Sequence, residues 1–347
     1  MDSFRPPIVH YTHYQAGHCE SGGVASLLSN YGMALSEPMA FGVSSCIMFA
    51  YFPFLRLWEM PFFSFRMPLG YTIKGVQRAL GVRFRTRTYQ DEDEAMAELD
   101  RLLDEGKPVG ARVSASFLPY LLENINGPLI PVLDMHNNGH MVIIYGRQDD
   151  TYLVSDPVCE HATTVKRDEM RKARFAKGSN PPRGNLFYPD HIPSLVDYRA
   201  AVRRATRKTS RMMLQPLLPY VGVKAIHAMA RRIERLGQCG NPRFVRRFLG
   251  NIIMVQEVMG TAGAGFRFIY AAFLKEAGDL LDLPALRDAS RRMLAVGDLW
   301  QEFAYHCVKV VKGPLTPTDT RPIAAALRRC GDEERQVYLM LRRMQWG

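Results

Sequence analysis

The secondary-structure pattern of the sequence changes near residue 190. Residues 177–193 are rich in glycine and proline, which interrupt helices and strands. Before this stretch, helical and strand patterns alternate along the chain. After it we find only helical patterns, which cover roughly residues 197–208, 224–236, 243–259, 266–281, 284–311 and 323–344. At 347 residues the chain can bury two cores. We therefore predict an α+β protein with an N-terminal domain over residues 1–190 and an all-helical domain over residues 191–347.

The most strand-like segment of the chain is residues 140–146. A polar turn and a second strand pattern over residues 151–155 follow it, which together predict a β-hairpin. His140 begins the first strand and Asp156 directly follows the second. The hairpin would therefore place these two side chains at the same edge of a sheet, where the carboxylate can orient the imidazole.

A cysteine lies at the predicted start of a helix near the N-terminus. Cys19 follows a glycine-containing turn, and an apolar helical pattern begins at Val24. Unpaired backbone N–H groups and the positive end of the helix dipole favour a thiolate over a thiol at such a position. Packed against the hairpin edge, this helix would complete a nucleophile, base and orienting acid from Cys19, His140 and Asp156. The alternative is a buried, inert cysteine beside a hairpin whose His and Asp only end its strands.

The motifs around these residues resemble those of known enzymes in their order and spacing. They are GHCES at 17–21, LSEPMAFG at 35–42, GKPV at 106–109, GHMV at 139–142 and SDP at 155–157. The pattern resembles papain-like enzymes, more closely the bacteriocin-processing cysteine peptidases, and more closely still the butirosin-biosynthesis protein H family. The resemblance covers about residues 8–190 and implies a papain-like N-terminal domain. The helical remainder is similar to the domain that commonly follows in this family.

This resemblance implies acyl transfer in specialised metabolism, from the phosphopantetheine thioester of an acyl carrier protein to an amine. Cys19 would attack the thioester, His140 would take and return the proton, and Asp156 would orient the imidazole. The acyl or aminoacyl group would rest on Cys19 before it passes to the acceptor. No cofactor bound to the chain itself is expected, since the carrier protein presents the phosphopantetheine. A cysteine hydrolase, peptidase or amidase with the same triad is the alternative.

Four further residues are candidates for the site. Papain-like enzymes place an oxyanion-hole glutamine six residues before the cysteine, whereas this sequence has Gln15 only four residues before Cys19, so Gln15 is the candidate donor. His18 is a rival base or a substrate-binding residue, although neighbours at a helix start point in different directions. The glycine-rich segment 260–265 follows no strand and is best interpreted as a turn between helices. Alternatively, it brings Arg267 and Tyr270 to the substrate.

Positive charge is concentrated in residues 199–247, where Glu234 is the only acidic residue, and the whole chain carries a net charge of +11. A basic face attracts polyanions or acidic proteins, and acyl carrier proteins are acidic. Aromatic residues are not regularly interleaved with these charges and no nucleic-acid motif occurs, so we expect no nucleic-acid partner. A solvated basic face is the alternative.

The six cysteines are scattered and show no CxxC spacing. This argues against a zinc site or a disulfide framework, and it favours a reducing cytoplasm. We expect no metal. Residues 47–65 are rich in aromatic side chains, but Pro53, Arg56, Glu59 and Pro61 make a membrane span improbable. Asp2 and Arg5 interrupt any signal-peptide pattern at the first residues.

Overall fold

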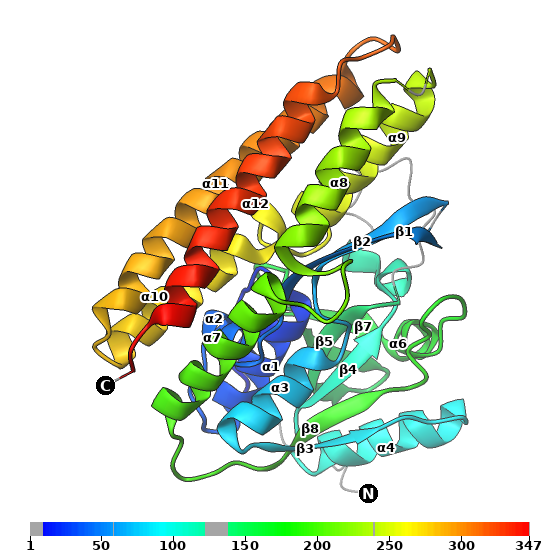
Figure 1. Cartoon of the computed structure of the whole chain (residues 1–347). Helices are drawn as coiled ribbons and strands as arrows, with labels where there is room; N and C mark the ends of the chain where they lie inside the picture. Colours follow the sequence, from blue (N-terminus) through cyan, green and yellow to red (C-terminus); the bar gives the residue numbers. More distant parts are fainter. Residues whose placement is uncertain (1–9, 58, 122–137, 239, 347) are drawn as a thin grey trace, which may run out of the picture. The chain divides into compact units, whose positions relative to one another are not determined.

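The computed structural model describes residues 10–57, 59–121, 138–238 and 240–346. The chain forms two compact units, each described by itself below (Figure 1). Unit 1 contains Met1–Ala40 and Gly81–Leu195, and unit 2 contains Phe41–Leu80 and Val196–Gly347. The predicted α+β class is confirmed.

Unit 1 is built on a six-stranded antiparallel sheet with the strand order β3-β8-β4-β5-β6-β7. The strands are β3 (Arg83–Arg87), β4 (Val109–Val113), β5 (His140–Gln148), β6 (Thr151–Ser155), β7 (Thr163–Lys166) and β8 (Leu186–His191). The helices of this unit are α1 (Cys19–Asn30), the start of α2 (Glu37–Val43), α4 (Glu92–Asp104) and α6 (Arg167–Arg174). The predicted hairpin is confirmed, because β5 pairs with β6 through a turn at residues 149–150.

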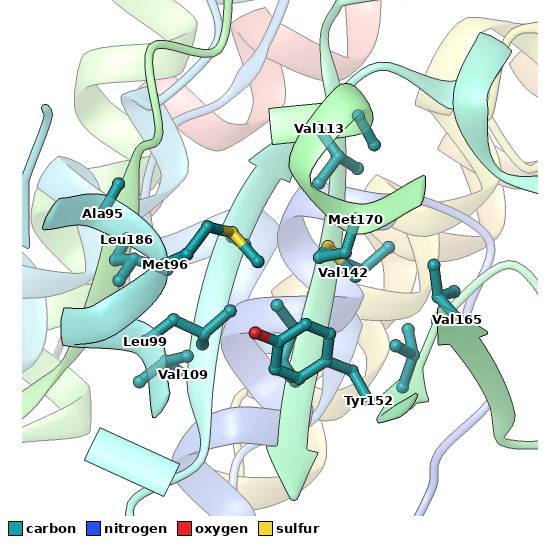
Figure 2. Close-up of a cluster of buried hydrophobic side chains, with 14 of the residues drawn as sticks. Ala95, Met96, Leu99, Val109, Val113, Val142, Tyr152, Val165, Met170 and Leu186 are labelled. Carbon is teal, nitrogen blue, oxygen red and sulfur yellow. The ribbon is translucent and has the colours of Figure 1, made fainter. Parts of the chain in front are cut away.

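One face of this sheet forms the main core of unit 1. Met96 and Leu99 of α4 and Met170 of α6 pack on Val142 and Tyr152 of the sheet, and all of them are buried (Figure 2). Side chains alternate between the two faces of a strand, so Ile143 points to the opposite face from Val142. There Ile143 lies against Gly23 of α1. The sheet therefore separates α1 from α4 and α6.

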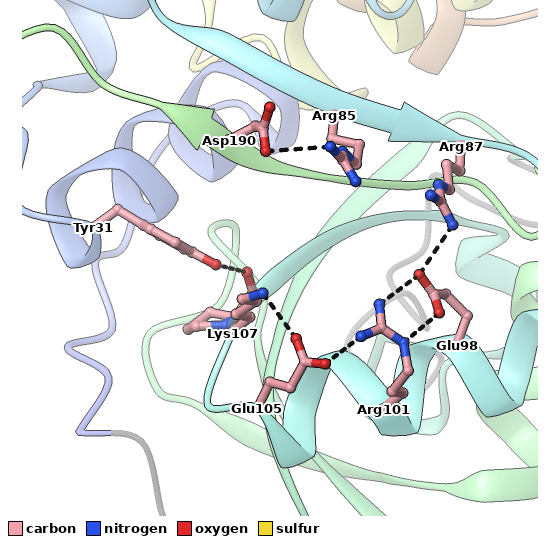
Figure 3. A network of polar contacts seen from close by, with 9 residues as sticks. Tyr31, Arg85, Arg87, Glu98, Arg101, Glu105, Lys107 and Asp190 are labelled. Carbon is pink, nitrogen blue, oxygen red and sulfur yellow. Dashed lines mark hydrogen bonds and ion pairs between the residues drawn. The ribbon is translucent and has the colours of Figure 1, made fainter.

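Polar contacts tie α1 to the sheet and α4 to the outer strand β3. The Tyr31 hydroxyl, at the end of α1, donates a hydrogen bond of 2.9 Å to the carbonyl of Pro108, just before β4 (Figure 3). Glu98 of α4 forms ion pairs of 3.2 Å with Arg87 of β3 and 2.7 Å with Arg101. Exposed pairs of this kind contribute about 0–1 kcal/mol each, so the apolar face carries most of the stability of the unit.

Unit 2 is a helical bundle with one β-hairpin. The hairpin consists of β1 (Ile47–Leu57) and β2 (Met60–Arg66). The helices are α3 (Tyr71–Leu80), α7 (Tyr198–Leu214), α8 (Gly222–Leu236), α9 (Pro242–Ile253), α10 (Arg267–Leu280), α11 (Pro284–Lys312) and α12 (Arg321–Arg343). Helix α12 runs alongside both α8 and α11 (Figure 1). The six helices expected after residue 197 are all present, with ends shifted by a few residues.

The division into units differs from the single boundary expected near residue 190. The second segment does begin close to that point, at Val196, but the structure also assigns Phe41–Leu80 to the helical unit. The reason is the aromatic content of the β1–β2 hairpin. Phe49 and Phe65 are buried, and their ring centroids lie 5.7 and 5.3 Å from that of Trp300 in α11. These rings are core residues of unit 2.

The glycine-rich segment connects two helical segments, as expected from the lack of a preceding strand. It follows a helical turn that ends at Val258 and leads into α10. Backbone φ is positive at every residue from Ala262 to Phe266. At Gly265 a Cβ atom would lie 2.3 Å from the Phe65 ring, so only glycine fits there.

Candidate active site

Cys19 is the first residue of α1, at the position that the sequence indicated. His18 precedes it with extended backbone angles (φ −136°, ψ 126°) and is the N-cap, because its Nδ1 atom accepts a hydrogen bond of 3.3 Å from the Ser21 N–H. Cys19 is 8% exposed. At the first position of a helix, the positive end of the helix dipole favours a thiolate over a thiol.

The hairpin places His140 and Asp156 next to each other. His140 begins β5 and Asp156 directly follows β6, and the Nε2 atom of His140 lies 2.6 Å from Oδ2 of Asp156. Two further donors hold the carboxylate. The Tyr120 hydroxyl donates to Oδ2 at 2.9 Å, and the Val158 N–H donates to Oδ1 at 3.1 Å. The carboxylate is therefore fixed on both oxygens.

The Cys19 side chain lies close enough to His140 for its charge and its hydrogen-bonding capacity to raise the pKa of the ring. Because Nε2 faces Asp156, Nδ1 is the ring nitrogen left for the thiol. Burial opposes protonation of the imidazole, but the charges of Asp156 and Cys19 and the hydrogen bonds to them outweigh it, so the pKa of His140 is held well above its usual value. The structure thus brings together all three residues of the predicted triad.

The carboxylate of Asp156 is kept in its ionised form. Burial alone would raise its pKa, but the charge of His140 and the hydrogen bonds from His140, Tyr120 and Val158 hold the pKa of Asp156 below its usual value. Asp156 is fully buried and His140 is 6% exposed. A buried carboxylate bonded to the ring stabilises the imidazolium form, which is the form that pairs with a thiolate.

The turn before Cys19 is attached directly to the turn after Asp156. The Ala16 N–H donates a hydrogen bond of 2.6 Å to the carbonyl of Pro157. A Cβ atom at Gly22 would lie 2.3 Å from that of Ala16 and 3.0 Å from that of Pro157, so a glycine in α1 allows this close approach. The nucleophile and the orienting acid are therefore positioned by one small contact region.

Glu37, the first residue of α2, also holds the cysteine turn. Its two carboxylate oxygens accept the N–H groups of Gly17 at 2.9 Å and His18 at 2.7 Å, and the Ser21 hydroxyl donates to it at 3.2 Å. Burial raises the pKa of Glu37, although these three donors oppose that effect. In the sequence, Glu37 stands out only as part of the motif at 35–42, so its contact with the cysteine turn was missed.

Tyr120 was missed altogether. It lies 36 residues before Asp156, in a region without strand or helix periodicity, so no sequence pattern connects the two. Only the folded chain places its hydroxyl on the carboxylate.

The other candidates lie elsewhere or have other partners. Gln15 is exposed, four residues before Cys19, and its role as an oxyanion donor stays a prediction. At the sixth position before Cys19, the two ring nitrogens of His13 lie 2.8 Å from the Ser155 hydroxyl and 3.1 Å from the carbonyl oxygen of Cys159. The Nδ1 atom of His18 is engaged with Ser21, which favours a capping role over that of a rival base.

Arg267 and Tyr270 belong to the core of unit 2. Both are fully buried. Arg267 forms an ion pair with the buried Glu334, donates a hydrogen bond of 2.6 Å to the carbonyl of Gly265, and stacks 4.6 Å from the centroid of the Trp300 ring. These contacts favour a structural role and argue against the substrate-binding role expected for the two residues.

The described residues contain no cluster of His, Cys, Asp or Glu side chains suited to a metal ion. Within the same residues, no helix is long and apolar enough to cross a membrane. The basic residues of α7 and α8 are largely exposed, among them Arg203, Arg207, Arg211, Arg231 and Arg235.

The fold and the site define an α+β protein with a buried Cys–His–Asp arrangement at the start of a helix, which points to a cysteine-type enzyme. Residues 168–341, half of the chain, match the model of a family described as a domain of unknown function, DUF4872, and the chain belongs to that family. Residues 18–157 match the model described as butirosin biosynthesis protein H, N-terminal. The resemblance predicted from the sequence is thereby confirmed.

A crystal structure described as that of a putative C39-like peptidase from Bacillus anthracis is similar to this chain, with a TM-score of 0.35 and 14% sequence identity. The similarity covers 54% of this chain and 98% of that one. So distant a likeness supports no conclusion about the site. A comparison with the curated proteins gave no match.

Proposed function

We propose that this chain is a cysteine acyltransferase that accepts an acyl or aminoacyl group from a carrier-protein thioester and passes it to an amine. The observation that carries the proposal is Cys19 beside a His140 ring whose Nε2 atom lies 2.6 Å from Oδ2 of Asp156. The match to butirosin biosynthesis protein H supports a biosynthetic role for this chemistry.

In the first half of the reaction, the Cys19 thiolate attacks the thioester carbonyl carbon. A bond from Cys19 sulfur to that carbon forms, and the bond to the pantetheine sulfur breaks. The imidazolium of His140 gives its Nδ1 proton to the departing thiolate, while Asp156 stays ionised and keeps the ring oriented. The Cys19 N–H, at the helix start, is placed to stabilise the oxyanion that forms in between.

In the second half, the acceptor amine attacks the acyl group on Cys19. His140, now neutral, takes the proton that the amine loses, and the Cys19 thiolate leaves. The low exposure of Cys19 and His140 supports transfer to an amine, because a buried acyl group meets less water. The carrier protein supplies the phosphopantetheine, and the exposed arginines of α7 and α8 offer an acidic carrier a face of opposite charge.

A cysteine hydrolase or peptidase is the second candidate, because the same three residues can direct water to the acyl group. Product analysis separates the two. The enzyme is incubated with a loaded carrier protein, with and without a panel of primary amines, and the products are identified by mass spectrometry. Amide that forms only when amine is present supports the transferase. Free acid released at an equal rate with and without amine supports the hydrolase.

A further inference from the structure

The carboxylate of Glu37 reaches from α2 to the turn that presents Cys19. It spans 20 residues to Gly17 and 19 residues to His18, and it accepts the backbone N–H of each, one on each oxygen. A third donor, the Ser21 hydroxyl, comes from the first turn of α1. Three donors from one short segment thus converge on a single side chain of another helix.

These bonds determine which backbone donors remain around the nucleophile. The start of a helix leaves four N–H groups without a partner in the helix. Of these, the Ser21 N–H goes to the His18 ring, and the first bond within the helix runs from the Gly22 N–H to the His18 carbonyl. With Gly17 and His18 bonded to Glu37, the Cys19 N–H has no acceptor among the described residues. It is the donor nearest to the thiol along the chain.

The same bonds fix the orientation of that donor. The peptide unit between His18 and Cys19 contains both the His18 carbonyl and the Cys19 N–H. The His18 carbonyl accepts a hydrogen bond of 2.9 Å from the Gly22 N–H. The preceding peptide unit contains the His18 N–H, which donates a hydrogen bond of 2.7 Å to Glu37. Rotation of the Cys19 N–H therefore requires that one of these two bonds break.

We propose that Glu37 is a positioning residue that acts through Gly17 and His18 to aim the Cys19 N–H at the oxyanion of the reacting thioester. This inference rests on the proposed acyl transfer. It provides one oxyanion donor from the backbone, and this donor does not depend on Gln15. Glu37 itself touches neither the substrate nor the thiol.

The test compares two reactions of the same thiol in a Glu37→Gln variant. Acylation by an acyl-pantetheine thioester develops an oxyanion, whereas alkylation by iodoacetamide displaces iodide and develops none. The amide keeps the shape of Glu37 but offers one acceptor where two N–H groups need one each. We expect acylation of Cys19 to slow about 10- to 100-fold, as when an oxyanion donor is misplaced, and alkylation to change less than about 3-fold.

The outcomes are separable. An equal loss in both reactions would mean that Glu37 only supports the fold or the thiolate, and an unchanged acylation rate would mean that it has no role; either result overturns the inference. The exposed Glu94 in α4 provides the matched control, Glu94→Gln, which should leave both rates unchanged. If Glu37→Gln does not fold, Glu37→Asp takes its place, because it keeps the charge. It should slow acylation less than expected for Glu37→Gln and leave the alkylation rate nearly unchanged. A wild-type chain that is not acylated at all contradicts the proposed function itself, before any variant is compared.

Discussion

The Nε2 atom of His140 and the Oδ2 atom of Asp156 lie 2.6 Å apart, at the adjoining ends of two paired strands. This spacing fixes the ring and leaves Nδ1 for the Cys19 thiol. The same carboxylate holds the Tyr120 hydroxyl and the Val158 N–H, so its orientation is determined by three different segments of unit 1.

Asp156→Asn should abolish most of the activity while the chain stays folded. The amide cannot hold the ring in the tautomer and charge state that the thiol needs, and the corresponding change in a serine protease triad costs about 10⁴-fold in kcat. The initial rate of acyl transfer, together with circular dichroism, measures both properties. Asp150→Asn, in the exposed turn of the same hairpin, is the control and should retain the wild-type rate.

The raised pKa of His140 and the lowered pKa of Asp156 predict how stability depends on pH. The contribution of His140 to the free energy of unfolding is fully present below the pKa of His140 in the unfolded chain, about 6.5. It disappears as pH rises through the pKa of His140 in the folded chain. The contribution of Asp156 is present above its unfolded pKa, about 3.9, and disappears as pH falls through its lowered folded value. The extra stability of wild type over His140→Gln should therefore be largest near about pH 5–6 and decline in alkali. Urea unfolding of both proteins across this pH range measures the difference in their free energies of unfolding. A difference that does not change with pH would contradict an ion pair between His140 and Asp156.

Tyr120→Phe should weaken the site without disabling it. The variant removes one donor from a buried carboxylate that keeps two others, and a hydrogen bond to a charged group contributes about 1.5–3 kcal/mol. We expect a lower free energy of unfolding by that amount, a higher pKa for Asp156, and a rate loss much smaller than that of Asp156→Asn. A rate equal to that of Asp156→Asn would show that the hydroxyl has a direct catalytic task.

The sequence identified the hairpin ends and the helix start because each depends on local pattern. His140 and Asp156 are the ends of alternating strands, and Cys19 precedes an apolar helical run. The roles of Glu37 and Tyr120 were not predicted, because they arise from contacts between segments 16 to 36 residues apart. Local periodicity carries no information about such contacts. The placement of residues 47–66 in unit 2 was not predicted for the same reason. This aromatic hairpin belongs to unit 2 because it packs on Trp300, which lies far along the chain.

Arg267→Met should destabilise unit 2 by about 3–5 kcal/mol, because it leaves the buried Glu334 carboxylate without its counter-charge. The double variant Arg267→Met/Glu334→Gln should recover much of this loss, since it removes the second charge and keeps an acceptor for the Trp300 indole. Chemical denaturation of the variants measures both effects. The exposed pair of Arg321 and Asp319 provides the control, and Arg321→Met should cost about 0–1 kcal/mol. An unchanged stability for Arg267→Met, with a raised KM, would restore the substrate-binding interpretation.

The central claim is that Cys19 carries the acyl group, and intact-mass analysis after incubation with a loaded carrier protein tests it most directly. Cys159 is the matched control within unit 1, because burial and the nearby Asp156 raise the pKa of its thiol to about 12 and leave it unreactive. We predict one acyl adduct on the wild-type chain and on Cys159→Ala, mapped to Cys19 by peptide analysis, and none on a folded Cys19→Ala variant. An adduct that persists in Cys19→Ala, or full transferase activity in that variant, would contradict the account.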